Sequence, residues 1–169
     1  MNLQKSNDSN NCIITHLKNV RDHNNANKLK LATVLGCQVI VDLNAKEDDL
    51  VLFFSSNLRL SHEYLHYNNL YSNKELNVDT TQRGYFGKNG RVRAQRFRGE
   101  VSNGYVADLE SLKVAAHPNI VTSVSVQPEE FLEEGDEFTH INGVKICEKY
   151  VVPTFCLDFY FLYYCWLYF

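Results

Sequence analysis

After residue 11 the chain consists mainly of short runs of β-type residues separated by turn residues. Within 28–35, Lys28-Leu29-Lys30-Leu31 alternates polar and apolar residues, which predicts a half-buried strand. Gly36-Cys37 stands between two such runs and predicts a tight hairpin. Many short strands with little helix predict a mainly β fold, either a small barrel or a sandwich. The predicted strands are 12–20, 28–35, 38–43, 49–54, 91–98 and 104–109.

Two segments break the strand pattern and predict short helices. In 61–71, apolar residues lie near helical spacing behind Ser61, which can cap a helix. In 128–134, Pro128 suits a first helical turn, acidic residues favour the N-terminal end of the helix dipole, and Gly135 ends the element. The density of acidic residues after Pro128 predicts a solvated face rather than a binding site.

The two ends of the chain differ in composition from the middle. Residues 1–11 are rich in Asn and Ser and predict a disordered arm. The tail 154–169 is dominated by aromatic residues, and its last fifteen residues would reach about 22 Å as a helix, short of a roughly 30 Å hydrocarbon core. The tail is therefore a buried terminal segment, an interfacial anchor or, as we favour, the translated remnant of a truncated gene.

The overall composition is that of one globular domain. The chain has 169 residues, of which 44% are apolar, enough to form a core. Its five cysteines include no CxxC pair, and no signal sequence precedes them, which predicts reduced thiols in a cytoplasmic protein. The same spacing predicts no cysteine-borne metal site.

Positive charge is concentrated in one stretch of a chain whose net charge is −3. The segment 83–99 contains no acidic residue, and its glycines can bring backbone N–H groups close to a phosphate. Basic groups would bind phosphates while aromatic rings stack on unpaired bases, so the segment predicts nucleic-acid binding. The alternative is a glycine-rich turn that leads into an exposed basic strand. The candidate nucleic-acid-binding residues are Arg83, Tyr85, Phe86, Lys88, Arg91, Arg93, Arg96 and Arg98.

A second motif, His62-Glu63-Tyr64-Leu65-His66, has the form H-E-x-x-H. On a helix, His62 and His66 would share one face and bind zinc, with Glu63 as the general base of a metallopeptidase. No Gly-x-x-His continuation follows, so we expect a short surface helix and keep the zinc site as an alternative.

Several stretches together resemble a known family. The run His23-Asn24-Asn25-Ala26-Asn27-Lys28-Leu29 is similar to the His-Pro-Asn-Ala-Asp-Lys/Arg-Leu signature of OB-fold modules, from which Asn24 and Asn27 depart. Further stretches resemble the N-terminal OB-like domain of phage and bacterial ATP-dependent RNA ligases. They are Leu70-Tyr71 with 75–77, Gly84 to Arg93, 97–99 with 102–104, and 135–138 with 141–150.

This resemblance implies a small OB-like barrel over 12–127 that binds RNA, followed by an acidic helix and linker over 128–153 toward a catalytic domain. Ligases of this family form a lysyl-adenylate on a Lys-x-x-Gly motif, and none of the ten lysines here has Gly three residues later. We therefore expect a fragment without its catalytic domain and inactive alone. ATP and Mg are implied for the full-length family, with no cofactor in this chain.

The expected partner is RNA, in the cytoplasm of a bacterial or phage-infected cell, with no membrane and no obligate protein partner. Two alternatives from other classes stay open. One is the zinc metallopeptidase using residues 62–66, and the other is a membrane-associated interaction protein anchored by the aromatic tail.

Overall fold

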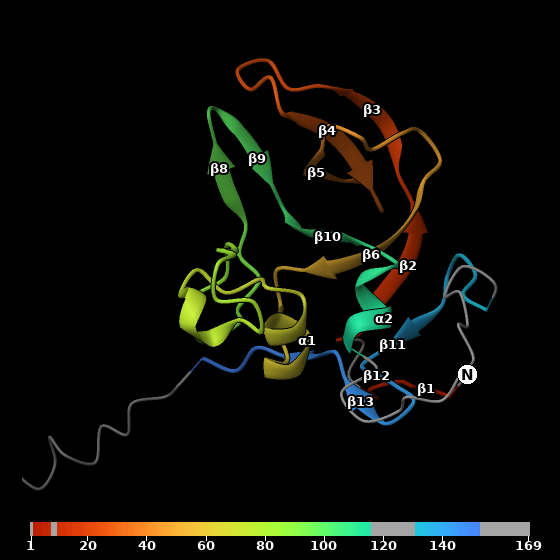
Figure 1. Ribbon diagram of the computed structural model, residues 1–169. Helices are drawn as coiled ribbons and strands as arrows, with labels where there is room; N and C mark the ends of the chain where they lie inside the picture. Colours follow the sequence, from red (N-terminus) through yellow and green to blue (C-terminus); the bar gives the residue numbers. More distant parts are fainter. Residues whose placement is uncertain (1, 8–9, 116–130, 153–169) are drawn as a thin grey trace, which may run out of the picture.

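The computed structural model describes residues 2–7, 10–115 and 131–152 (Figure 1). Within these residues strands dominate and two short helices accompany them, which confirms the predicted mainly β class. The helices are α1 (His62–Tyr67) and α2 (Ser111–Ala115), with a 3-10 helix η1 (Lys74–Leu76). The strands are β1 (Leu3–Gln4), β2 (Cys12–His16), β3 (Lys18–Asp22), β4 (Leu29–Val34), β5 (Cys37–Asp42), β6 (Leu50–Ser55), β7 (Leu58–Leu60), β8 (Gln95–Phe97), β9 (Glu100–Ser102), β10 (Gly104–Asp108), β11 (Glu137–Phe138), β12 (His140–Ile141), β13 (Val144–Lys145) and β14 (Cys147–Lys149).

Strand β6 lies at the centre of the fold, paired with β2 on one side and β10 on the other. Val51 and Phe53 project into a hydrophobic cluster shared with β4 and β5. Leu52 and Phe54 project into a second, larger cluster against α1, α2 and the C-terminal strands. Because both faces of β6 are covered, its sequence is a continuous apolar run rather than an alternating one.

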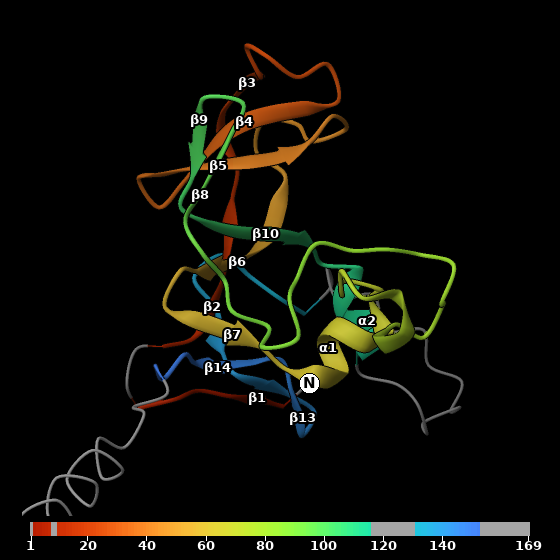
Figure 2. The same ribbon diagram turned by 90° about the vertical axis from the view of Figure 1, so that its left-hand side faces the viewer.

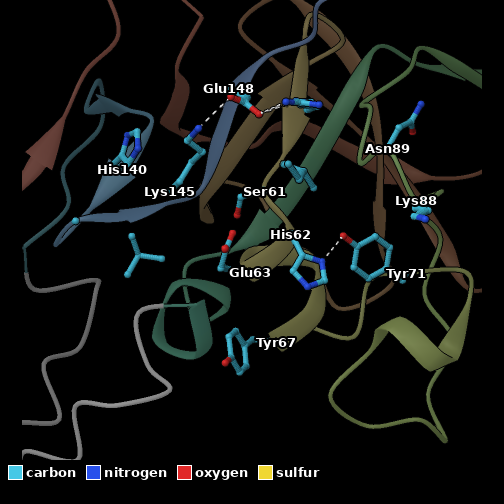
Figure 3. Close-up of a pocket in the computed structure, with 14 residues that line it drawn as sticks. Ser61, His62, Glu63, Tyr67, Tyr71, Lys88, Asn89, His140, Lys145 and Glu148 are labelled. Carbon is cyan, nitrogen blue, oxygen red and sulfur yellow. Dashed lines mark hydrogen bonds and ion pairs between the residues drawn. The ribbon is translucent and has the colours of Figure 1, made fainter.

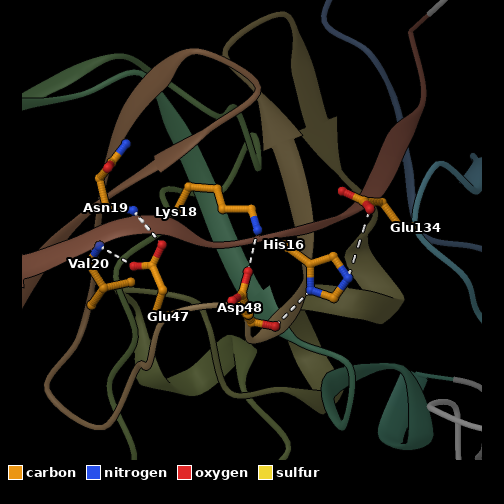
Figure 4. Close-up of polar contacts among 7 residues, drawn as sticks. All are labelled: His16, Lys18, Asn19, Val20, Glu47, Asp48 and Glu134. Atoms are coloured by element: carbon orange, nitrogen blue, oxygen red, sulfur yellow. Dashed lines mark hydrogen bonds and ion pairs between the residues drawn. The ribbon is translucent and has the colours of Figure 1, made fainter.

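The segment that contains β2 and β3 contributes one strand to each of two sheets. Strand β2 pairs with β6, whereas β3 pairs with β4, and the register shifts between Lys18 and Arg21. The turn before β6 holds this bend: Glu47 accepts the backbone N–H groups of Asn19 and Val20, at 2.9 and 2.8 Å (Figure 4). Beside them Lys18 forms an ion pair with Asp48. The bend therefore brings the β3-β4-β5 sheet over one face of the β10-β6-β2-β11 sheet.

Three hairpins close with the same kind of two-residue turn. Both central residues have positive φ in Leu35-Gly36, Arg98-Gly99 and Asn142-Gly143. This is the type I′ geometry, whose twist matches that of paired strands. The hairpin predicted at Gly36 is thus confirmed, with Cys37 already the first residue of β5.

The described strands do not close into a barrel. Strand β5 lies beside β9 and β10 (Figures 1 and 2), but they share no strand ladder. Separate hydrogen bonds cross this gap instead: the Asn103 N–H donates to the Gln38 carbonyl at 2.9 Å, the Ile40 N–H donates to Ser102 Oγ at 3.1 Å, and Gln38 Nε2 donates to the Val101 carbonyl at 2.9 Å and to Glu100 at 3.2 Å. The predicted barrel is therefore replaced by a partly open arrangement of small sheets.

Helix α1 confirms the first predicted helix. Ser61 has extended backbone angles, and its side chain accepts the Tyr64 N–H at 3.0 Å. Tyr64 and Leu65 are the buried residues of this helix. The cap and the apolar spacing were both visible in the sequence, which is why this short element could be located.

Other expectations about segments differ from the structure. In the predicted arm 1–11, β1 pairs with β12, and Asn11 is buried. In the predicted basic strand 91–98 only β8 is a strand of a ladder. The predicted linker carries strands that pack on the domain, since β11 pairs with β2 and β14 with β7. Short strands such as β1 and β11 lack a local pattern and depend on distant partners.

The second predicted helix is absent from the described part of its range. Residues 131–134 form turn and irregular backbone, while 128–130 lie outside the described residues. Helix α2, which the sequence did not predict, is only five residues long and too short to show a helical period. The tail 154–169 also lies outside the described residues. Of the helices described, none is long and apolar enough to cross a membrane.

Candidate nucleic-acid interface

The basic residues of 83–98 are not neutralised by acidic ones. Among the described residues, none of Arg83, Lys88, Arg91, Arg93, Arg96 and Arg98 forms an ion pair. Elsewhere Lys18 pairs with Asp48, and both Arg59 and Lys145 pair with Glu148. Positive charge without an internal counterion is available to an external anion such as phosphate.

The loop that carries Tyr85 is fixed by close backbone packing. The N–H groups of Tyr85 and Phe86 both donate to the Leu70 carbonyl, at 2.9 and 2.8 Å. A Cβ added to Gly84 would come within 2.2 Å of the Leu70 carbonyl carbon, so only glycine permits this approach. Phe86 is held inside at 2% exposure, while Tyr85 is held outside at 53%.

The β8–β9 hairpin is docked by the 23–25 segment. The Asn25 amide donates to the Arg98 carbonyl at 2.9 Å, and Arg98 Nη1 donates back to the Asn25 carbonyl at 2.8 Å. Asn24 Nδ2 donates to Glu100 at 2.8 Å. The His23 ring packs edge-on against Phe97, with ring centroids 6.2 Å apart. The signature-like residues 23–25 thus position the hairpin that carries part of the basic segment.

Between the hairpin, the 84–86 loop and the β4–β5 sheet lies a cavity of about 350 Å³, here called the aromatic groove. Strand alternation points Gln95 and Phe97 toward it and turns Arg96 to the opposite face of β8. None of its lining residues is charged. They are Leu29, Ile40, Leu70, Gly84, Tyr85, Phe86, Gln95, Phe97, Ser102, Gly104 and Tyr105.

The exposed Phe97 ring of the groove has an arginine as a direct neighbour. The Arg98 guanidinium lies 5.5 Å from the Phe97 ring centroid. Burial raises the pKa of Tyr85, and the positive charge of Arg93, which precedes Gln95 by two residues in the chain, opposes this shift. Arg93 makes no hydrogen bond or ion pair within the described protein. The groove is therefore neutral inside and positive at its rim.

Two candidate residues have different surroundings from those expected. Phe86 is buried, and its ring packs edge-on against Tyr85 and Tyr105, so it supports the groove and offers no free face. The backbone of Arg91 forms an isolated antiparallel β-bridge with that of Arg59, outside the β8 ladder. The Arg91 guanidinium lies 4.2 Å from the Tyr150 ring centroid. Its Nε is buried without a hydrogen-bond partner in the described protein. Arg91 is thus separated from the hairpin arginines.

A second cavity, here called the His62 cleft, lies between α1 and the C-terminal strands (Figure 3). It has a volume of about 680 Å³ and contains Lys88 as well as the pair of Lys145 with Glu148. Arg59 donates from Nε to the same Glu148 at 2.6 Å. Burial raises the pKa of Glu148, but hydrogen bonds from Lys145 and Arg59 outweigh it and leave that pKa lowered. Two of the three Lys and Arg side chains that line this cleft are therefore paired with the same carboxylate.

His62 and Glu63 of the H-E-x-x-H motif line this cleft, whereas His66 does not. The rings of His62 and His66 stack with centroids 5.5 Å apart, as the helical spacing predicts. His62 Nδ1 shares a hydrogen bond of 2.9 Å with the Tyr71 hydroxyl, and His66 Nδ1 bonds the Leu76 carbonyl at 2.7 Å. Among the described residues, no group of three His, Cys, Asp or Glu side chains could hold a metal ion.

Gln95 and Tyr105 line the groove but were not predicted as site residues. Burial, with smaller effects of Asp108 and Tyr85, raises the pKa of Tyr105 to about 12, so its hydroxyl stays protonated at neutral pH. Tyr105 belongs to an ordinary-looking strand, and Gln95 is one uncharged residue among arginines. Only the alternation of β8 around Arg96 could have indicated that Gln95 and Phe97 share a face.

No family model matches the sequence, and no curated protein matches it. Solved structures of Naegleria gruberi RNA ligase do match the fold. One mutant of that ligase with ATP and Mn has a TM-score of 0.53 at 18% identity, covering 84% of this chain and 36% of the ligase chain. A second mutant, with AMP and Mn, has a TM-score of 0.52 at 17% identity, covering 84% and 35%. The chain spans about a third of the length of these ligase chains, and it has a fold related to part of an RNA ligase.

Proposed function

We propose that this chain is an RNA-binding domain of an ATP-dependent RNA ligase. The observation that carries the proposal is the set of unpaired basic side chains in 83–98 beside the exposed rings of Tyr85 and Phe97. Basic groups supply affinity through the release of counterions from phosphates, and aromatic rings supply stacking contacts to bases. A protein of this kind would act on RNA in the cytoplasm.

Two features support an OB-like domain of the type that phage and bacterial RNA ligases carry at their N-terminus. An OB fold is a five-stranded, partly open barrel, and here the bent β2–β3 segment joins two sheets that remain open between β5 and β10. The second feature is the resemblance at 23–29, whose first residues fix the β8–β9 hairpin. The similarity to part of Naegleria gruberi RNA ligase is consistent with this assignment.

The chemical step of ligation would be performed by a part of the ligase other than this chain. No lysine of the sequence stands in a Lys-x-x-Gly motif. The amine that attacks ATP, and the Mg that assists it, are therefore assigned to the adenylyltransferase domain of a full-length enzyme. The purified chain incubated with radiolabelled ATP should form no AMP adduct that survives denaturation, and such an adduct would contradict this division of roles.

Fluorescence anisotropy with a short single-stranded RNA, measured at several salt concentrations, tests the proposal. Log affinity should fall linearly with log salt, with a slope of about −0.7 for each phosphate bound. The matched control is Lys18→Ala, because Lys18 is already paired with Asp48 and should leave the slope unchanged. Binding no tighter than about millimolar at low salt would overturn the proposal.

A further inference from the structure

We infer that the aromatic groove binds a single unpaired base of the RNA, stacked on Tyr85 and Phe97, with the flanking phosphates on Arg93 and Arg98. This inference rests on the proposed function and adds to it the class of substrate: RNA with an unpaired nucleotide, as at a strand end or gap. The groove residues, rather than total charge, would then decide which RNA binds.

The chemistry of the groove matches a base better than any charged group. A base is flat and neutral, and the lining of the groove holds no charged residue. The His62 cleft contains both signs of charge, and the third large cavity carries Asp42, Asp49, Asp108 and Glu110, which would repel RNA. The volume of about 350 Å³ lies near the lower end of the range for small-ligand sites, which suits one heterocycle and excludes a duplex.

The two aromatic rings are held in place while their surfaces stay accessible. Phe97 is 44% exposed, although its hairpin is tied to Asn25 and its ring rests against His23. Tyr85 is exposed above a backbone hydrogen-bonded to Leu70. Rigid, exposed rings favour stacking because little conformational entropy is lost when a base binds.

Polar groups without a protein partner complete the site. The Gln95 side chain and the Tyr105 hydroxyl form no hydrogen bond within the described protein, although both residues line the groove. An amide presents a donor and an acceptor side by side, as the edge of a base requires. Positive charge for the phosphates on either side of the base comes from Arg98, which lies beside Phe97, and from Arg93, which precedes Gln95 by two residues in the chain.

A paired base cannot enter such a groove without leaving its helix. Unstacking and unpairing cost a few kcal/mol, and this cost is least for a base that is already unpaired. Sequence-tolerant stacking on aromatic rings is accordingly typical of proteins that bind single strands. The groove should therefore favour single-stranded RNA over a blunt duplex of equal charge.

The test compares a short RNA with an oligomer of the same length in which every nucleotide is abasic. Binding of each is measured by fluorescence anisotropy at low salt. Because the abasic oligomer keeps its phosphates, it isolates the contribution of the bases. The intact chain should bind the normal RNA about 5- to 150-fold more tightly, which corresponds to about 1–3 kcal/mol for a stacked base. A blunt RNA duplex should bind with an affinity close to that of the abasic oligomer.

The double variant Tyr85→Leu with Phe97→Leu should lose this preference and retain its affinity for the abasic oligomer. Phe131→Leu is the matched control, since Phe131 is an exposed phenylalanine that does not line the groove, and it should behave like the unmodified chain. Gln95→Ala guards against misfolding of the double variant, because the Gln95 side chain forms no hydrogen bond within the described protein. This variant should reduce the preference at an unchanged melting temperature.

The outcomes distinguish failure of the groove as a base site from failure of the proposed RNA-binding function. If both oligomers bind equally well and with salt dependence, RNA binding stands and the base site is wrong. If neither oligomer binds, the proposed function itself is wrong. A preference for bases that survives both the double variant and Gln95→Ala would also overturn the groove as the site.

Discussion

The aromatic groove and the His62 cleft lie on the same small domain and differ in how their positive charges are treated. In the cleft, Arg59 and Lys145 converge on Glu148. At the rim of the groove, Arg93 and Arg98 have no acidic partner among the described residues. A count of basic residues would rank both regions as phosphate sites. The difference shows that the position of one carboxylate decides whether an arginine is available to a ligand.

Aromatic residues differ between the two regions in the same way. In the cleft, the Tyr71 hydroxyl is engaged by His62, and the residue is 3% exposed. In the groove, Tyr85 and Phe97 expose their rings, and the Tyr85 hydroxyl has no hydrogen-bond partner in the described protein. Internal hydrogen bonding and burial make Tyr71 structural, whereas the groove residues stay free to contact a ligand.

The largest expected effect concerns the backbone that shapes the groove. Gly84→Ala should lower the free energy of unfolding by about 3 kcal/mol, because its Cβ would collide with the Leu70 backbone, which cannot turn aside. Gly87→Ala in the same loop should stay within about 0.5 kcal/mol, since its Cβ meets only the Asn89 side chain, at 3.8 Å. Urea denaturation measures both. Equal stabilities would mean that the loop packs differently.

The next effect concerns salt dependence at the groove rim. Arg93→Ala with Arg98→Asn should flatten the plot of log RNA affinity against log salt by about 1.4, or about 0.7 for each lost phosphate contact. Asparagine suits Arg98 because its φ of +47° is the conformation that Asn-Gly turns adopt.

Arg59→Ala is the control from the cleft and should leave the salt slope unchanged, because the Arg59 guanidinium is engaged in an ion pair with Glu148. Anisotropy titrations at several salt concentrations measure all three proteins. A larger change of slope for Arg59→Ala than for the rim variant would reverse the comparison between the two regions.

A smaller effect is expected for the two histidines of the H-E-x-x-H motif. His62→Ala with His66→Ala should leave RNA affinity unchanged and lower stability by about 1 kcal/mol, through the lost bonds to Tyr71 and the Leu76 carbonyl. Thermal unfolding and anisotropy report these two quantities. Any zinc-dependent peptidase activity that the double variant abolished would show that the H-E-x-x-H motif is functional.

The smallest effects should appear in the pH dependence of stability. The pKa of Glu148 is lowered in the folded protein despite its partial burial, so its contribution is present above its ordinary value of 4.5 and is lost as pH falls through the folded value. Glu148→Gln should therefore be less stable at neutral pH by under about 1 kcal/mol, and the deficit should disappear in acid.

Asp108 should show the opposite sign. Burial, followed by the charges of Asp42, Asp49 and Glu110, raises its pKa, so its ionised form destabilises the fold at neutral pH. Asp108→Asn should accordingly be slightly more stable at neutral pH, by under about 1 kcal/mol, with no gain below the ordinary value of 3.8. Urea midpoints measured from pH 3 to 8 test both variants. If the stabilities of Glu148→Gln and Asp108→Asn, relative to the unmodified chain, change with pH in the same direction, this expectation is wrong.

Local patterns in the sequence determined the fold class, most strands around β4, β5 and β6, the hairpin at Gly36 and the capped helix after Ser61. These features depend on side-chain alternation, turn residues and caps, which act over a few neighbouring residues. The sequence also determined that basic and aromatic residues are concentrated in 83–98. It could not show that Phe86 is buried and Phe97 exposed, because both lie in aromatic, glycine-rich surroundings.

The tertiary structure alone decided which charges are paired and which rings are exposed. Arg59 meets Glu148 across 89 positions of the chain, and Asn24 meets Glu100 across 76. The strands β1 and β11 likewise exist only through β12 and β2. Burial and ion pairing depend on partners that folding brings together, and no local pattern encodes them. The unpaired arginines at the groove rim are therefore a property of the folded domain.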